Sequence, residues 1–254
     1  MTDAIRTAYD RSAEAWREGP ALLYARLADA LLDRAPLPLP GVAVLDAGAG
    51  TGVAGDAARR RGAAKVVAVD LAPAMLPASP AMPVAADLLG LPFRDATFDL
   101  AVAAFSLGHL PSPGPALAEL RRVAPALLAS AFAAGWTHPA KDVVEHVLSE
   151  HGYRPPTWYT AFKEGTERQV GAADRLGALA RDAGYAEIVV DLVEVDTGLT
   201  EPTDLVAWRL GMAHHAPFVA GLAPETRESA RREAVDLLAG APPVVVPMLA
   251  LTAT

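Results

Sequence analysis

The residues best placed to do chemistry lie in the stretch VLDAGAGTGVAGD, residues 44–56. Asp46 ends a short apolar run, and Gly48, Gly50 and Gly52 follow it at alternate positions. Glycine lets the backbone approach a bound molecule closely and adopt conformations that other residues avoid. A carboxylate beside such a loop can accept hydrogen bonds from the ammonium or hydroxyl groups of a ligand. This stretch therefore predicts a loop that binds an organic ligand.

Two glycine patterns overlap in this loop. Gly50, Gly52 and Gly55 match the G-x-G-x-x-G of nicotinamide or flavin sites, whereas residues 46–52 match the D-x-G-x-G-x-G of adenosylmethionine sites. In a dinucleotide site the first glycine normally follows the strand directly, whereas here an acid, Asp46, lies at the strand end two positions before Gly48. An acid there favours adenosylmethionine, whose amino-acid end carries an ammonium group. Asp70 suits either ligand, because both present a ribose diol that a carboxylate can bind.

Apolar runs that read as strands alternate with helical segments along most of the chain. The predicted strands are VAVLDA, AKVVAVD, MPVAAD, FDLAVAAFS, LLASAFAA, EIVVDLVEVD and VVVPMLALTA, residues 42–47, 64–70, 82–87, 98–106, 127–134, 187–196 and 244–253. Helices are predicted over residues 2–34, 115–125 and 172–185, and LAPAML, residues 71–76, reads as the start of another. This alternation predicts an α/β fold with a parallel sheet, which binds ligands at the carboxyl ends of its strands. Asp46, Asp70, Asp87 and Ser106 all fall at such ends.

In this order the motifs resemble the class I adenosylmethionine-dependent methyltransferases, specifically the small-molecule branch similar to ubiquinone and menaquinone C-methyltransferases. VLDAGAGTG is similar to motif I of that family, VVAVDLAPAML to motif II, and residues 85–125 to its later motifs. The resemblance covers about residues 40–133, with a weaker echo at 172–195. RVAPALLAS departs from the family, because it is shorter than the usual Arg-Pro-Gly-Gly turn. The resemblance implies a Rossmann-like, seven-stranded, mostly parallel sheet with a helical cap.

The same resemblance implies S-adenosyl-L-methionine as the cofactor and assigns contacts to it. Asp46 is expected to face its ammonium group. The remaining implied contacts are Gly48, Gly50 and Thr51 with the methionine portion, Asp70 with the ribose, Leu71 and Met75 with the adenine, Asp87 with the adenine amine, the Leu88 amide with a ring nitrogen, and Ala104, Phe105 and Ser106 with the region of the sulfonium.

We expect residues 1–254 to form one methyltransferase domain. Its expected parts are an N-terminal helical cap at 1–35, a cofactor-binding half at 40–133, cap insertions at 134–170 and 201–240, and the rest of the sheet at 172–200 and 241–254. All four tryptophans lie in the cap segments, which suits an organic substrate with rings or alkyl chains. The alternative is that these aromatic side chains form the core of the cap itself. The expected substrate-binding residues are Tyr9, Trp16, Trp136, His138, Trp158, Trp208 and His214.

His109, just after the fourth predicted strand, is the candidate catalytic base. A histidine packed at a strand end is the alternative. The six histidines lack the spacing of a zinc site and the chain has no cysteine, so we predict no metal. The absence of cysteine also excludes pyrimidine methylation through a thiolate nucleophile.

Composition argues against nucleic acid and membranes as partners. A net charge of −8 gives no electrostatic reason to bind nucleic acid. No apolar run is long enough to cross a membrane, and the first residues do not read as a signal peptide, so a cytoplasmic location is expected.

The function that we predict is methyl transfer to oxygen, nitrogen or carbon of a small, apolar organic molecule, in secondary metabolism. One alternative is a cofactor-binding protein of the same fold, such as a cyclase, that transfers no methyl group. Another is an NAD(P)-dependent oxidoreductase. The sequence leaves open whether the chain is a monomer or a homodimer.

Overall fold

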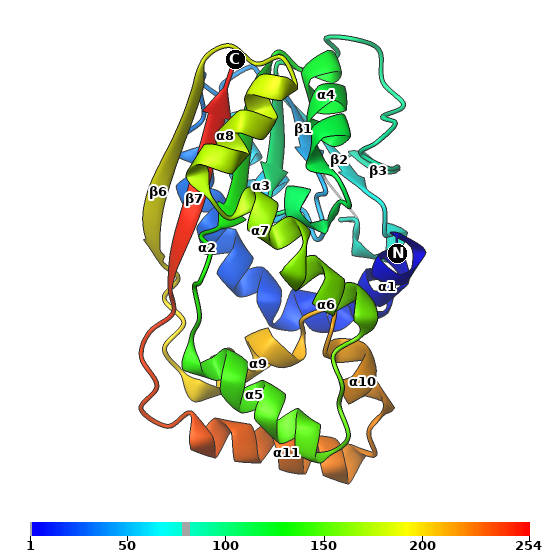
Figure 1. Ribbon diagram of the computed structural model, residues 1–254, viewed down its shortest axis with the longest axis vertical. Coiled ribbons are helices and arrows are strands. Elements are labelled where there is room, and N and C mark those ends of the chain that lie inside the picture. Colours follow the sequence, from blue (N-terminus) through cyan, green and yellow to red (C-terminus); the bar gives the residue numbers. More distant parts are fainter. Residues whose placement is uncertain (1, 78–81) are drawn as a thin grey trace.

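The computed structural model describes residues 2–77 and 82–254, and its centre is one twisted sheet (Figure 1). The strands lie where β-branched and other apolar residues run together, which is typical of strands buried on both faces. Their bounds are β1 (Ala43–Ala47), β2 (Lys65–Asp70), β3 (Met82–Ala85), β4 (Leu100–Ala104), β5 (Ala126–Phe132), β6 (Ile188–Asp196) and β7 (Val245–Ala253).

The strand order is β3-β2-β1-β4-β5-β7-β6. Strands β1 to β5 are parallel to one another, and β7 runs antiparallel to both of its neighbours. This arrangement confirms the predicted seven-stranded, mostly parallel sheet. Because β1 is hydrogen-bonded to β2 on one side and β4 on the other, the loops after these three strands emerge side by side.

Helices cover both faces of the sheet and form two hydrophobic cores with it. One face packs against α2 and α3, and the other against α4 and α8. Short α7 lies beside β5 and leads into α8. The bounds of these helices are α2 (Pro20–Leu32), α3 (Val53–Arg60), α4 (Pro113–Val123), α7 (Thr166–Val170) and α8 (Ala173–Asp182).

The remaining helices gather beyond the carboxyl ends of the parallel strands, at the bottom of Figure 1. Helix α9 packs against α5, α11 and α1 within this layer and against α2, which contacts the sheet. We call this layer the cap. Its helices are α1 (Thr2–Glu18), α5 (Pro139–Glu150), α6 (Thr157–Glu164), α9 (Pro202–Leu210), α10 (Ala216–Gly221) and α11 (Pro224–Leu237).

Two local predictions were wrong. The single helix expected over residues 2–34 is broken between α1 and α2 at Gly19, followed by Pro20. A Cβ at Gly19 would lie 2.2 Å from the carbonyl oxygen of Ala207 in α9, so only glycine permits this close crossing. As a result α1 belongs to the cap, whereas α2 lies on the sheet. The helix expected from residue 71 is a single 3-10 turn, η1 (Pro73–Met75).

Among the residues that the structure describes, no helix combines the length and apolar character needed to cross a bilayer.

Candidate functional site

The loop after β1 is shaped by glycines in left-handed conformations. Gly48 has φ +71° and Gly50 has φ +52°, values that other residues rarely adopt. A Cβ at Gly48 would also lie 2.4 Å from the Cβ of Ser106, the residue that follows β4 and Phe105. The Ser106 hydroxyl donates to the carbonyl of Ala47 at 2.8 Å, which holds the ends of β1 and β4 together. The loop therefore curves tightly around a cavity at the carboxyl edge of the sheet.

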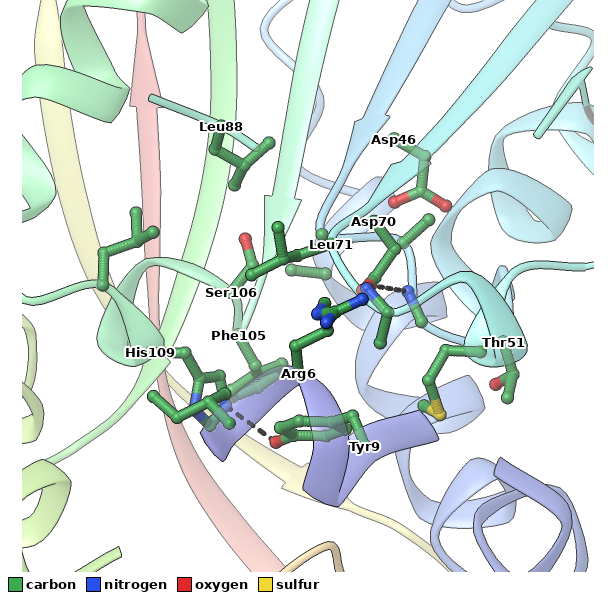
Figure 2. A pocket seen from close by; sticks show the side chains of 18 of the residues that line it. Arg6, Tyr9, Asp46, Thr51, Asp70, Leu71, Leu88, Phe105, Ser106 and His109 are labelled. Carbon is green, nitrogen blue, oxygen red and sulfur yellow. Dashed lines mark hydrogen bonds between the residues drawn. The ribbon is translucent and has the colours of Figure 1, made fainter. Parts of the chain in front are cut away.

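We call this cavity the glycine-loop cavity (Figure 2). Its wall contains every residue expected at the cofactor: Asp46, Gly48, Gly50, Thr51, Asp70, Leu71, Met75, Asp87, Leu88, Ala104, Phe105 and Ser106. By contrast, Gly52 and Gly55 are not among its lining residues. Gly55 faces the sheet instead, because a Cβ there would lie 2.9 Å from both Asp46 Oδ2 and Val66 Cγ1. Of the glycines in the two overlapping patterns, Gly48 and Gly50 therefore line the cavity, together with Asp46.

Asp70 joins the loops that follow two neighbouring strands. Its Oδ2 accepts a hydrogen bond from the Gly50 amide and its Oδ1 accepts one from the Ala72 amide, both at 2.8 Å. Burial raises the pKa of Asp70, and these amides act in the opposite direction. Each carboxylate oxygen keeps a second lone pair, so a carboxylate fixed in this way can still accept two hydroxyl groups of a ligand.

Asp46 is 1% exposed at the floor of the same cavity. Its Oδ2 accepts a hydrogen bond from the Gly55 amide at 2.8 Å. Burial nevertheless raises the pKa of Asp46 to about 7, since no cation within the described residues forms an ion pair with it. The Thr51 hydroxyl, on the same loop, is buried without a hydrogen-bond partner among the described residues. Both groups fit a polar, cationic ligand end.

The glycine-loop cavity also has apolar lining residues and a second acid at a strand end. Met75 and Leu88 are buried, and Leu71 is half-buried. Asp87 accepts a hydrogen bond from the Leu89 amide at 2.9 Å, which fixes its carboxylate at the cavity wall. Flat apolar surfaces beside a fixed acceptor suit a heterocyclic base with an exocyclic amine.

Helix α1 covers the opening of this cavity. Figure 2 shows Arg6 and Tyr9 projecting from α1 toward the loops that follow the strands. The Tyr9 hydroxyl lies 3.1 Å from His109 Nε2, and the ring of His109 stacks on Phe162 with centroids 4.8 Å apart. Burial lowers the pKa of His109 to about 4, so this imidazole is neutral around pH 7. His109 Nδ1 is buried and has no hydrogen-bond partner among the described residues.

A second cavity of ≈ 770 Å³ lies on the other side of Tyr9 and His109, between the sheet edge and the cap. We call it the cap cavity. It shares Tyr9, Tyr24, Phe105 and His109 with the glycine-loop cavity. Four of the residues expected at the substrate, Trp136, Trp158, Trp208 and His214, also line it.

Phe105, between the two cavities, has φ +57°, which is unusual for a residue with a side chain. Its amide lies 3.2 Å from both the carbonyl and the hydroxyl oxygen of Ser130. Its ring contacts those of Tyr24 and Phe132, with centroids 5.5 and 4.5 Å away. This strained conformation places an aromatic ring where the two cavities meet.

Two expected substrate residues lie elsewhere. His138 lines neither cavity, because its Nδ1 accepts a hydrogen bond from the Ala140 amide as the N-cap of α5 and its Nε2 lies 3.0 Å from the Pro242 carbonyl. The structure gives His138 the role of an N-cap, and its contact with a substrate stays a prediction. Of the two cavities, Trp16 lines only the glycine-loop cavity, where its ring packs at a tilt against those of Tyr9 and Tyr24.

Several lining residues were not anticipated from the sequence. Tyr24 lies in α2, after the break at Gly19. This break, which positions Tyr24, was not predicted from the sequence. Phe132, Tyr159 and Phe162 reach the cap cavity from β5 and α6. Lys141 and Arg209 also line it, and no motif marks either residue.

Comparison with known proteins agrees with this geometry. Residues 45–125 match the family described as a methyltransferase domain. Malonyl-[acyl-carrier protein] O-methyltransferase of Halorhodospira halophila is 41% identical over an alignment of 129 residues that covers 47% of this chain and 43% of that protein. Demethylmenaquinone methyltransferase of Corynebacterium kroppenstedtii is 36% identical over an alignment of 126 residues that covers 48% of this chain and 53% of that protein. The matches thus span about half the length of these relatives.

A solved structure from Anabaena variabilis, provisionally assigned as a methyltransferase of an antibiotic biosynthesis pathway, has a TM-score of 0.61. It is 16% identical and covers 90% of this chain and 96% of its own, so the likeness concerns the fold. The family that matches residues 45–125 agrees with the glycine loop, the acids at the strand ends and the order of the strands. The chain thus contains a methyltransferase domain, and its glycine loop and sheet resemble those of the class I S-adenosylmethionine-dependent methyltransferases.

Proposed function

We propose that this protein transfers a methyl group from S-adenosylmethionine, held in the glycine-loop cavity, to a small organic acceptor in the cap cavity. The observation that carries this proposal is the shared wall of the two cavities, formed by Tyr9, Tyr24, Phe105 and His109. A donor and an acceptor on either side of such a wall could meet where the cavities join. Positioning two reactants in this way can lower a reaction barrier by about 7–11 kcal/mol.

The lining of the glycine-loop cavity fits this donor. Asp70 would bind the ribose hydroxyls, and Asp87, with the Leu88 amide, would bind the adenine between the apolar side chains of Leu71 and Met75. Asp46 would face the ammonium group, beside the tight turn at Gly48. When bound, the sulfonium supplies an electrophilic methyl group whose departing thioether needs no acid.

The chain's own contribution is to orient the reactants and exclude water. Helix α1 covers the donor site through Tyr9, whose ring also contacts Trp16 and His109. His109 is neutral and can accept a proton at Nδ1, but its low pKa makes it a weak base. We therefore propose that His109 positions the acceptor through Tyr9 and Phe162, and that any strong base acts elsewhere or is not required.

A protein of the same fold that binds the donor without using it remains the principal alternative, and no residue of either cavity favours it. We also propose that the acceptor is not a nucleic acid, which the net charge of −8 supports, and that the reaction takes place in the cytoplasm.

The proposal is tested by calorimetric titration with adenosylmethionine and adenosylhomocysteine, with NADH and NADPH beside them. We expect the adenosyl ligands to bind at micromolar concentration and the nicotinamides to show no binding. Asp70→Asn should weaken the adenosyl ligands at least about tenfold, since it removes a charge-assisted hydrogen bond to the ribose. Asp99→Asn is the matched control, because Asp99 also accepts a backbone amide, that of Ala43, but lies outside both cavities. Binding of NADH alone, or equal effects of the two substitutions, would contradict the proposal.

A further inference from the structure

We propose that the acceptor is an organic acid, whose carboxylate binds Arg209 inside the cap cavity while its apolar body contacts the aromatic wall. This inference rests on the proposed function and specifies the class of its substrate.

Arg209 is buried in an unusual way. It lies in the last turn of α9 and is 4% exposed, the one arginine among the buried polar residues that the structure describes. Its Nη2 lies 3.3 Å from His214 Nε2, and its Nε has no hydrogen-bond partner within residues 2–77 and 82–254. The guanidinium also lies 5.2 Å from the ring centroid of Trp208. None of these partners carries a negative charge.

Other arginines of this chain have acidic partners although they are more exposed. Arg61 pairs with Asp29 and Asp33, and Arg122 pairs with Glu119 and Asp95. No described acid forms an ion pair with Arg209. Burying a charge without a partner costs several kcal/mol, so a buried cation that lines a cavity calls for an anion supplied by a ligand.

Lys141 adds a second positive group to the same cavity. Its Nζ lies 3.0 Å from the carbonyl oxygen of Trp136 and 3.6 Å from the centroid of that ring. Burial, and then the nearby charges of Arg209 and Lys163, lower the pKa of Lys141 to about 7. The two cations therefore act on each other across the cavity, and an anion between them would relieve this repulsion.

The acids on the cavity wall limit how much negative charge a ligand can bring. Glu167 pairs with Lys163, so these two groups balance. Glu145 is half-buried on the same wall and offsets one of the two inner cations. The exposed Asp142 and Glu164 are balanced by the exposed Arg168 and Arg175. One positive charge therefore remains when Lys141 is protonated, which suits a monoanion better than a phosphate dianion. The planar guanidinium also matches the geometry of a carboxylate.

The surroundings of Arg209 specify the rest of the ligand. His214 stacks on Tyr159 with centroids 3.8 Å apart and an interplanar angle of 8°. Trp136 stacks in turn with Phe132 and Trp208, at centroid distances of 5.2 and 6.2 Å. A flat or apolar body can lie along these rings while its acid group reaches Arg209.

Matched pairs of probes test the inference. The affinities of indole-3-acetate and indole-3-acetamide, and of phenylacetate and phenylacetamide, are measured by calorimetry in the presence of adenosylhomocysteine. We expect each acid to bind at least about tenfold more tightly than its amide, because a charge-assisted pair replaces a neutral hydrogen bond. Arg209→Met should abolish this preference and Lys141→Met should reduce it.

Control variants separate recognition from folding. Arg209→Lys keeps the charge and should retain part of the preference, whereas Arg175→Gln, at an exposed position of the same cavity, should change it less than about twofold. Three results would each overturn the inference. They are equal affinity for acid and amide, no binding of either acid at millimolar concentration, and an unchanged preference in a folded Arg209→Met protein. Adenosylhomocysteine binding, measured on the same samples, reports on the proposed function separately, because its loss would refute the donor site and not the acid site.

Discussion

The buried carboxyl group of Asp46 gives a direct test of the structure of the loop after β1. Its side chain is 1% exposed and burial raises its pKa from 3.8 to about 7. A carboxyl group with a raised folded-state pKa binds protons more tightly in the folded than in the unfolded chain. Its stabilising contribution is therefore fully present below about pH 4 and is lost as the pH rises through about 7.

The size of this effect follows from the two pKa values. Between about pH 5 and about pH 8 the Asp46 contribution to the free energy of unfolding should fall by roughly 2–3 kcal/mol. An asparagine side chain at this position cannot ionise, and its oxygen can still accept the hydrogen bond from Gly55. Asp46→Asn should therefore be more stable than the natural protein at about pH 8, with an advantage that shrinks by the same amount toward about pH 5.

Urea unfolding of both proteins at the two pH values measures this difference directly. Other titrating groups, including Asp70, are present in both proteins and largely cancel. The same substitution should weaken adenosylmethionine binding at least about tenfold, since the buried carboxylate that faces the ammonium is lost. A stability difference independent of pH would refute the reasoning about Asp46, and unchanged ligand affinity would refute its role at the donor.

Three further outcomes are expected. Gly48→Ala should destabilise the protein by about 1–3 kcal/mol more than Gly41→Ala in urea unfolding, because both glycines have positive φ but only a Cβ at Gly48 meets Ser106; equal losses would contradict this. His109 should leave no inflection in the pH profile of kcat between about pH 6 and 8, because burial lowers its pKa to about 4; an inflection lost in His109→Gln would contradict this. Trp208→Ala should cost about 3–5 kcal/mol of stability, since this side chain is 2% exposed in the core, and a loss below about 1 kcal/mol would show that it is not a core residue.

The strands and the donor loop could be predicted because their signals are local. Most of the predicted strands contain the one that the structure has, since runs such as VVAVD combine β-branched residues with a polar end. The parallel order then brings Asp46 and Asp70 to one edge of the sheet, which requires no knowledge of side-chain packing.

The cap cavity could be predicted only in outline, because it is formed by contacts between segments that lie far apart in the sequence. Trp136 and Trp208 come from different insertions, and only the packing of α5 and α9 brings them together. The capping role of His138 was not predicted, although a residue directly before Pro139 at the first position of a helix is well placed to be an N-cap. Arg209 has no motif, and its significance follows from the absence of an acidic partner among the described residues, which no local pattern reveals.

The most direct test of the account is a crystal structure of the protein with adenosylhomocysteine. We expect the ribose hydroxyls to bind Asp70, the adenine to lie beside Leu88 and Asp87, and the amino-acid end to lie beside Gly48 and Asp46. The sulfur should then point toward Phe105 and the cap cavity. A ligand bound outside the glycine-loop cavity, or one whose sulfur faces away from the cap cavity, would contradict the account.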